Sequence, residues 1–266
     1  MKSSDTITPE SIFDESSPAL QLIKLCKRFG EFIAVDHIDL TVPRGSFYGV
    51  VGPNGAGKTT SLSMAVGLLR PDGGDVKIFG VDVWRNPTHA KMLVGVLPDG
   101  LSMPERLTGR ELLTYIGLLR GMDAKKVAHR TEELLTVLEL NNAEKTLVIN
   151  YSTGMRKKIG LALALLHAPK LLVLDEPFEA VDPISATTIK KILQRFVASG
   201  GSVVFSSHVM ALVEQLCDHV AVITKGQVVA SGTMDYVCGE QSLEETFARL
   251  VGSRTDGGGE LPWLVY

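Results

Sequence analysis

A glycine-rich segment at residues 52–59, GPNGAGKT, has the residue types and spacing of a loop that binds phosphate. Glycines allow the backbone to wrap around an anion, so that consecutive N–H groups and the start of a helix face it. We expect the Lys58 ammonium to reach the β and γ phosphates of a nucleotide and the Thr59 hydroxyl to bind Mg²⁺. The plainer alternative is a glycine-rich turn that precedes a helix. The residues expected to contact the nucleotide here are Gly52, Asn54, Gly55, Ala56, Gly57, Lys58, Thr59 and Thr60.

Two carboxylates and one histidine are the candidates for hydrolytic chemistry. Asp175 and Glu176 follow an apolar run at residues 171–174, and His208 follows a second run at residues 203–206. Ligands of open α/β sheets bind at the carboxyl ends of the strands. We therefore expect Asp175 to hold Mg²⁺ through water and Glu176 to polarise the attacking water as general base. The alternatives are an acidic pair that caps a strand and a histidine with a structural role, but all three residues are predicted to lie at one sheet edge.

The elements that must position these residues alternate between strand and helix. A buried strand at residues 47–51 leads into the glycine-rich loop, and a helix over residues 58–69 leaves it before the breakers at residues 70–74. The alternation resumes after residue 170 with a series of predicted elements: strand 171–174, helix 184–198, strand 203–206, helix 209–217, strand 220–224 and strand 227–230. This order predicts an α/β protein with a P-loop NTPase core and a mainly parallel sheet.

The remaining segments complete the predicted organisation. Period-two alternation at residues 37–42 and an apolar run at 20–25 indicate an N-terminal β part, which we expect to be antiparallel. A capping box at Thr108–Glu111 and helical spacing of leucines predict an inserted α-helical subdomain over about residues 100–168. The predicted domains are a flexible tail (1–18), the ATPase domain (19–240) and a C-terminal extension (241–266).

The composition narrows the class of protein without naming its chemistry. The 266 residues carry 27 basic and 30 acidic side chains, so the net charge of −3 lacks the basic excess expected of a protein that binds nucleic acid. No run approaches the roughly 18 apolar residues of a membrane span, and residues 1–5 lack the apolar region of a signal peptide. We therefore expect a cytoplasmic location. The three cysteines form no CxxC pair and are expected to be buried thiols.

A further segment connects these motifs to a known family. Residues 151–155, YSTGM, precede an amphipathic helix and lie shortly before the acidic strand. This segment resembles the signature of the ABC ATPases, which is usually LSGGQ. The phosphate loop, the signature, the acidic strand, residues 179–182 and His208 all follow one another in the order of that family's nucleotide-binding subunit. The resemblance covers about residues 20–240, and five motifs in order are far more specific than any one of them.

The resemblance implies roles for several other residues. Phe29 occupies the position of the aromatic residue that stacks on adenine, with Phe32 as the second candidate. In the family, ATP is bound between the phosphate loop of one subunit and the signature of another. Ser152 and Gly154 would then contact the γ phosphate of the partner's nucleotide, and Asp182 would signal across the dimer. His208 would hold the γ phosphate and the attacking water.

The chain departs from the family's usual pattern at four positions: Tyr151 for Leu, Thr153 for Gly, Met155 for Gln, and Asp99 for the Gln of the glutamine loop. A β-branched residue restricts the backbone beside a phosphate, so Thr153 is expected to weaken or reshape closure. The Asp99 carboxylate accepts hydrogen bonds from Mg²⁺-bound water but lacks the donor of an amide. We therefore still expect Asp99 to bind Mg²⁺, together with Thr59 and Asp175.

The resemblance implies an ATP-binding and ATP-hydrolysing subunit of an ABC transporter, with ATP and Mg²⁺ as cofactors. Its expected partners are integral membrane permease subunits and a second ATPase subunit, identical or a close paralogue, with no nucleic acid. The subunit would lie peripherally on the cytoplasmic face of the cell membrane, and the replacements favour export. Two alternatives remain open: a non-transport ABC ATPase such as a cluster-assembly subunit, and a regulatory module that binds nucleotide with little turnover.

Overall fold

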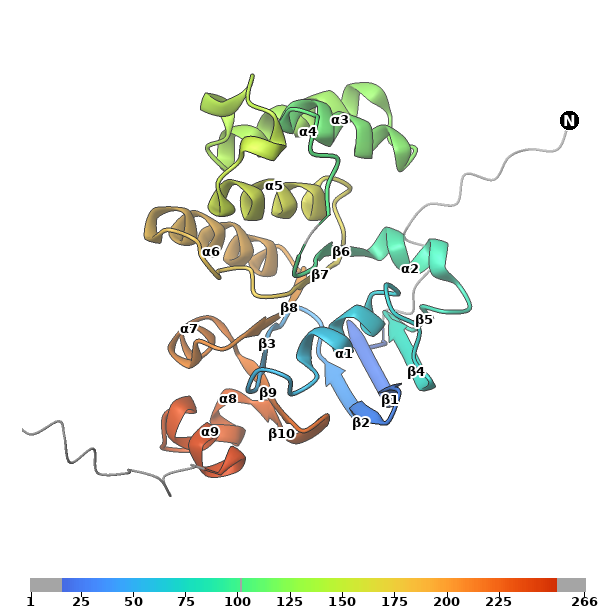
Figure 1. The fold of residues 1–266 in the computed structure, drawn as a ribbon, viewed down its shortest axis with the longest axis vertical. Coiled ribbons are helices and arrows are strands. Elements are labelled where there is room, and N and C mark those ends of the chain that lie inside the picture. Colours follow the sequence, from blue (N-terminus) through green and yellow to red (C-terminus); the bar gives the residue numbers. More distant parts are fainter. Residues whose placement is uncertain (1–15, 101, 253–266) are drawn as a thin grey trace, which may run out of the picture.

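Two β-sheets and a group of helices form the structure, a computed structural model that describes residues 16–100 and 102–252 (Figure 1). The smaller sheet has the strand order β2-β1-β4-β5, and all its neighbouring strands are antiparallel. Its strands are β1 (Leu20–Phe29), β2 (Phe32–Val42), β4 (Gly73–Ile78) and β5 (Val81–Asp82). The prediction of an N-terminal antiparallel β part is confirmed.

The larger sheet has the strand order β10-β9-β3-β8-β7-β6. Its strands are β3 (Phe47–Val51), β6 (Val94–Leu97), β7 (Leu171–Leu174), β8 (Ser202–Ser207), β9 (His219–Thr224) and β10 (Gln227–Thr233). All neighbours are parallel except β10, which runs antiparallel to β9. Val51 pairs with Ser207, and Leu174 pairs with Phe205. This register brings the carboxyl ends of β3, β7 and β8 to one edge of the sheet.

Helices pack around both sheets. Helix α1 (Lys58–Ala65) lies between the sheets, and α2 (Pro87–Leu93) leads into β6. The helical subdomain separates β6 from β7 and contains α3 (Gly109–Leu119), α4 (Ala124–Val137), the 3-10 turns η2 (Asn141–Ala143) and η3 (Val148–Asn150), and α5 (Thr153–Leu165). The predicted capping box is present, since the Thr108 and Glu111 side chains each accept from the other's backbone N–H. After β7 come α6 (Pro183–Ala198), α7 (Met210–Leu216), α8 (Met234–Cys238) and α9 (Leu243–Val251).

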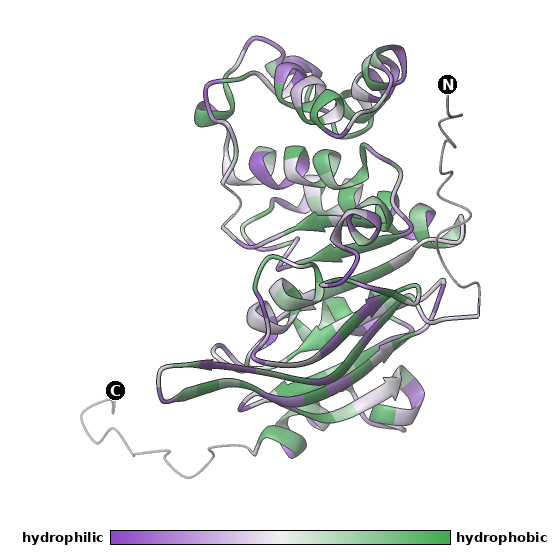
Figure 2. Cartoon of the chain, turned by 90° about the vertical axis from the view of Figure 1, so that its right-hand side faces the viewer, coloured by the Kyte–Doolittle hydropathy of each residue, from purple (hydrophilic) through white to green (hydrophobic). Residues whose placement is uncertain are grey.

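Two hydrophobic cores lie on opposite faces of the larger sheet. One fills the space between the sheets and includes Leu62 and Met64 of α1. The other joins the larger sheet to the helical subdomain and includes Leu112 of α3 and Ile159 of α5. Figure 2 shows the apolar strands enclosed between the layers. The core helix α1 and the core helix α5 therefore begin on opposite sides of the same sheet.

The structure differs from the sequence predictions in several elements. The predicted helix over 58–69 ends at Ala65, because Leu68 N–H bonds to the Ser63 carbonyl and Gly67, with φ of 76°, closes a Schellman turn. No sequence pattern predicted α2, β6, α8 or α9. Leu243 of α9 is buried in the core shared with α7, beyond the predicted domain boundary at residue 240. That boundary stays a prediction, and nearly all of the predicted N-terminal tail lies outside the described residues.

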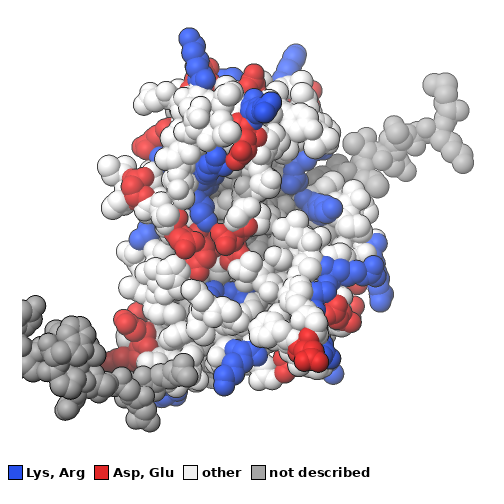
Figure 3. Space-filling model, in the orientation of Figure 1, with Lys and Arg blue, Asp and Glu red and all other residues white. Residues whose placement is uncertain are grey.

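Within residues 16–100 and 102–252, no helix has both the length and the apolar character needed to cross a membrane. On the face seen in Figure 3, Lys and Arg side chains are interspersed with Asp and Glu, in keeping with the small net charge.

Candidate nucleotide site

A cavity of about 660 Å³ lies at the edge where β3, β7 and β8 end. Its lining brings together residues that are distant in the sequence: the phosphate loop, the tip of the β1–β2 hairpin, and the segments after β6, β7 and β8. The lining residues are Phe29, Phe32, Ala34, Asn54, Gly55, Ala56, Gly57, Lys58, Thr59, Thr60, Asp99, Glu176, Glu179 and His208. The structure thus assembles most of the predicted contacts around one cavity. Gly52 lies at the start of the loop, directly after β3.

The phosphate loop is held by its own backbone and by Lys58. The Lys58 Nζ atom donates to the carbonyl oxygens of Gly52 at 2.7 Å and Pro53 at 3.2 Å. Only 7% of Lys58 is exposed, and burial lowers the pKa of its ammonium, while Glu176 and Asp175 oppose that shift. The cation is therefore fixed at the start of α1, where the helix dipole also favours an anion.

Gly57 is required by the geometry of this loop. It precedes α1 with φ of 104°, a backbone conformation that L side chains rarely adopt. A Cβ atom here would also collide with the carbonyl oxygen of Ala34 on β2. The loop can therefore approach the smaller sheet only because residue 57 has no side chain.

The acidic strand end is supported by the neighbouring strand. Asp175 is 4% exposed and accepts a short hydrogen bond from the hydroxyl of Ser206 on β8. The oxygen of the same hydroxyl accepts from the backbone N–H of Glu176 at 2.9 Å. Glu176 has φ of 45°, in the left-handed region, so the chain turns sharply between the two carboxylates. This turn lets Asp175 remain buried while Glu176 faces the cavity.

Glu176 and His208 form a pair in the cavity wall. The Nδ1 atom of His208 lies 3.1 Å from Oε2 of Glu176. The imidazole is 51% exposed, whereas the Glu176 side chain is 15% exposed. A carboxylate next to an accessible imidazole has the geometry needed to orient and deprotonate a water molecule in the cavity.

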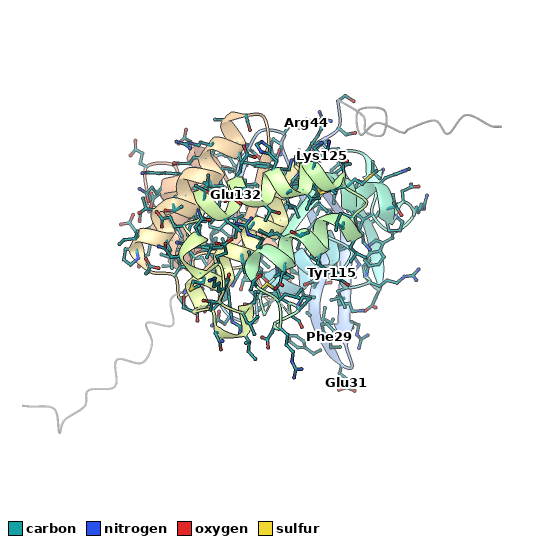
Figure 4. All side chains as sticks on the ribbon, turned by 90° about the horizontal axis from the view of Figure 1, so that it is seen from above. Phe29, Glu31, Arg44, Tyr115, Lys125 and Glu132 are labelled. Atoms are coloured by element: carbon teal, nitrogen blue, oxygen red, sulfur yellow. The ribbon has the colours of Figure 1, made fainter. Side chains whose placement is uncertain are left out.

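Two aromatic residues stand at the hairpin tip. Phe29 and Phe32 are register partners at the end of the β1–β2 hairpin, and both line the cavity. They are 51% and 61% exposed, and Figure 4 shows Phe29 with Glu31 at one margin of the molecule. The Lys27 ammonium lies 5.7 Å from the centroid of the Phe29 ring. Either exposed ring offers a face on which a base can stack.

The signature residues lie elsewhere. Ser152 is the N-cap of α5, and its hydroxyl oxygen accepts from Met155 N–H at 3.2 Å. A Cβ atom on Gly154 would lie 3.5 Å from Oδ2 of Asp182, so these two motifs are adjacent. Asp182 caps α6 by accepting from Ser185 and Ile184, and these hydrogen bonds, those from Ser185 above all, lower the pKa of its carboxyl group. Neither Ser152 nor Gly154 belongs to the lining of the 660 Å³ cavity.

The oxygen ligands expected for Mg²⁺ are present in and beneath the cavity. Thr59 and Asp99 line it, and Asp175 is buried next to Ser206. Among the described residues, no group of three or more His, Cys, Asp or Glu side chains forms a site that would hold a metal by itself. Mg²⁺ bound to nucleotides usually keeps several waters and takes one or two carboxylates together with phosphate oxygens. This donor set fits such an ion, and the assignment of individual residues stays a prediction.

The sequence predictions missed four residues of this site, and one of them, Ala34 on β2, lines the cavity. Ser206 bonds to the Asp175 carboxylate and to the backbone N–H of Glu176. Glu179 lines the cavity, and the Nζ atom of Lys157 donates to the Glu176 carbonyl at 2.9 Å. Ser206 is a polar residue at the end of an apolar strand, and this position is the one sequence feature that could have marked it as a site residue. Glu179 lies in the segment 179–182 of the family order but was given no contact, and Lys157 carries no signal, because charged residues on loops and helices are usually solvated.

Residues 35–179, which include the phosphate loop and the acidic strand end, are similar to those of a known protein family. A family model described as ABC transporter matches residues 35–179, which is more than half of the chain. The chain belongs to the ABC transporter family of ATP-binding proteins. The predicted family and the predicted P-loop fold are confirmed.

Curated relatives support the assignment to the ABC family. The chain is 38% identical over 215 residues to the daunorubicin/doxorubicin resistance ATP-binding protein of Streptomyces peucetius, a match that covers 81% of this chain and 65% of the relative. It is 33% identical to the bacitracin transport ATP-binding protein of Bacillus licheniformis, covering 83% of this chain and 72% of that protein. It is 37% identical to the Nod factor export ATP-binding protein I of Burkholderia lata, a match that covers 77% of this chain and 68% of that protein. The chain thus spans about two thirds of the length of these relatives.

Solved structures support the fold of the ABC family. The structure of an ATP-binding subunit of an ABC transporter superimposes with a TM-score of 0.81 at 26% identity, covering 87% of this chain and 99% of that chain. A dimeric ATP-binding cassette in a post-hydrolysis state has the same fold, with a TM-score of 0.74 at 21% identity.

Proposed function

We propose that this protein is the ATP-hydrolysing subunit of an ABC transporter that exports its substrate through separate membrane permease subunits. The observation that carries the proposal is the composition of the 660 Å³ cavity, which contains a phosphate loop with a buried lysine and a Glu–His pair. The names of the relatives, which include drug resistance, bacitracin transport and Nod factor export, support export.

Each residue then has a role that follows from its position. Lys58 and the backbone N–H groups of residues 55–60 bind the phosphates, and Phe29 stacks on the base. Glu176 accepts a proton from the attacking water, and His208 holds that water and the γ phosphate. Thr59, Asp175 and Asp99 would hold Mg²⁺, which would neutralise phosphate charge when bound.

The site requires a second subunit in this proposal. Ser152 and Gly154 lie outside the cavity of their own chain, at the start of α5. Two subunits related by a two-fold axis, with the phosphate loop of each facing the signature of the other, would place each signature against the other's nucleotide. Each closed dimer would then contain two composite sites, and a monomer would bind ATP but hydrolyse it slowly.

The permease contact is proposed near residues 96–120. Tyr115, Leu118 and Leu119 of α3 are exposed apolar residues in this segment, and Tyr115 is labelled in Figure 4. Exposed apolar side chains that lie together on one helix are typical of surfaces that contact another protein. The subunit would thus be held at the cytoplasmic face of the membrane by its permease.

The experiment that tests the proposal is the Glu176→Gln variant. The amide retains the shape of the side chain but cannot act as a base, so we expect ATP hydrolysis to fall by about 10³-fold. ATP binding should persist, and the variant should elute as an ATP-dependent dimer in size-exclusion chromatography. Wild-type turnover in this variant would contradict the role of Glu176, and the absence of any ATPase activity in the wild-type protein with its permease would contradict the proposed function.

A further inference from the structure

The backbone of Glu176 needs external support. Its φ of 45° lies in the left-handed region, which non-glycine residues occupy only where surrounding contacts hold them. The Ser206 hydroxyl oxygen accepts from the amide N–H of Glu176 at 2.9 Å, which fixes the peptide group before the residue. The carbonyl of the peptide group after Glu176 accepts from the backbone N–H of Glu179 at 3.2 Å, a contact within the same turn.

Lys157 provides a second contact to the same carbonyl, and this one comes from another element. Its Nζ atom donates to the carbonyl oxygen of Glu176 at 2.9 Å, across 19 positions of sequence. A hydrogen bond from an ammonium is stronger than one between neutral groups, and it is made here in a partly buried setting. The two peptide groups that flank the Glu176 Cα atom are therefore held by two different elements, β8 and α5.

The neighbouring cations of α5 contact other parts of the protein. Arg156 bonds to Glu105 at 2.8 Å and to the Ile149 carbonyl at 3.0 Å. Lys158 bonds to Glu139 at 3.3 Å. Successive helical residues point about 100° apart, so each of the three side chains leaves the helix in its own direction. Lys157 is the one of these three that reaches the acidic strand end.

We infer that Lys157 is a positioning residue that holds Glu176 in its working conformation and couples it to the signature helix. The inference rests on the proposed function, because it assigns Lys157 a role in the same hydrolytic site. Ser152, the N-cap of α5, lies in the segment proposed to dock on the partner subunit's nucleotide, and Lys157, five residues later, contacts the proposed general base of its own chain. A shift of α5 on docking would therefore change the direction of the Glu176 side chain without any change in the phosphate loop.

The first test compares the steady-state kinetics of Lys157→Met with those of the wild type. We expect kcat to fall about tenfold and KM for ATP to stay within about twofold, because a misplaced base affects the chemical step and leaves the phosphate contacts intact. Lys157→Arg retains the donor and should recover most of kcat. Arg156→Met is the matched control, since it removes the adjacent cation of the same helix and should leave kcat near that of the wild type.

A double variant tests whether the effect passes through Glu176. In the Glu176→Gln background, Lys157→Met should cause no further loss of the residual rate, because the base that it positions is already absent. A full tenfold loss in that background, or equal loss in Lys157→Met and Arg156→Met, would overturn the inference and indicate a general effect on α5.

Hydrogen exchange provides a readout that does not depend on turnover. Peptides that contain residues 175–182 should exchange faster in Lys157→Met than in the wild type or in Arg156→Met, because one anchor of that turn is lost. Equal protection in all three proteins would overturn the inference even where the wild type hydrolyses ATP. If the wild type lacked ATPase activity, the proposed function would fail, while the exchange result would still decide whether Lys157 anchors the turn.

Discussion

The phosphate-loop region and the signature region are built in opposite ways. The phosphate loop lies between two sheets, and its lysine is buried and bonded to the carbonyls of Gly52 and Pro53. The signature residues Ser152 and Thr153 are exposed at the start of a helix. The first region is a cavity lined by residues of one chain, whereas the second is the exposed N-terminal end of a helix.

This difference explains how one chain could carry the two proposed halves of a site that do not meet within it. The two regions share the larger sheet and pack on its opposite faces, so rigid packing keeps them apart within the monomer. A site that needs both must then take each from a different molecule. Under the proposed function, this separation would make hydrolysis depend on dimerisation.

The largest expected effect tests this separation by mixing two inactive variants. Lys58→Met removes the ammonium group that is proposed to bind the phosphates. Gly154→Asp adds a carboxylate beside Asp182 and beside the proposed position of the partner's phosphate. Each variant alone should retain about 1% or less of the ATPase activity. A 1:1 mixture should recover about a quarter of the wild-type rate, because half of the dimers contain one intact composite site.

Arg156→Met is the control for this mixture, since Arg156 lies on the same helix and bonds to Glu105 and to the Ile149 carbonyl, away from the proposed phosphate contacts. We expect this variant to fold and to retain most of its activity. No recovery on mixing Lys58→Met with Gly154→Asp, measured as phosphate release, would mean that both halves act within one chain.

The next effect concerns the enclosed region alone. Gly57→Ala should weaken ATP binding at least tenfold and lower the free energy of unfolding by about 2 kcal/mol, because φ of 104° and the Ala34 carbonyl both oppose a side chain. Gly55→Ala is the matched control, since its φ is 78° but a Cβ atom there has nothing within 4 Å. Calorimetric titration with ATP and urea unfolding measure the two quantities, and equal losses in both variants would argue against the collision with Ala34.

A third test addresses the end of α5 opposite the signature. Burial, assisted by the nearby Arg120, lowers the pKa of His167 to about 4, and its Nε2 atom lies 3.1 Å from the Val94 carbonyl of β6. Between about pH 6.5 and pH 4 the unfolded chain binds a proton at this residue and the folded chain does not. The free energy of unfolding should therefore fall by about 2 kcal/mol as the pH drops through this range.

His167→Gln should remove that part of the pH dependence, and His129→Gln, on an exposed face of α4, should leave it unchanged. Urea unfolding at pH 7, 5.5 and 4 measures the difference. If the wild type and His167→Gln lost stability in parallel, His167 would have no role in linking α5 to the sheet edge.

The smallest effect distinguishes the two aromatic residues at the hairpin tip. Phe29→Ala should weaken ATP binding about fivefold, which corresponds to about 1 kcal/mol of stacking, and Phe29→Tyr should preserve binding. Phe32→Ala is the parallel variant, since Phe32 is the register partner of Phe29 and lines the same cavity. Fluorescence titration with ATP measures both, and a larger loss in Phe32→Ala would transfer the stacking role to Phe32.

Much of the site was predictable from the sequence because its motifs are local. The phosphate loop, the cap at Ser152 and the carboxylates after β7 each depend on a few consecutive residues. The short elements were harder: β6 has four residues, and α2 has seven that begin at a proline. Periodicity needs a longer run than these to distinguish helix from strand.

The sequence by itself determined the chemical groups of this protein and the turns that carry them, because those turns depend on backbone preferences and hydrogen bonds between near neighbours. Only the tertiary structure decided that Ser206 supports Asp175 and Glu176, that Lys157 reaches the Glu176 carbonyl, and that the signature stays outside its own cavity. These contacts join residues 19 to 31 positions apart. They depend on the register of β7 with β8 and on how α5 packs against the sheet, and no short run of residues encodes either.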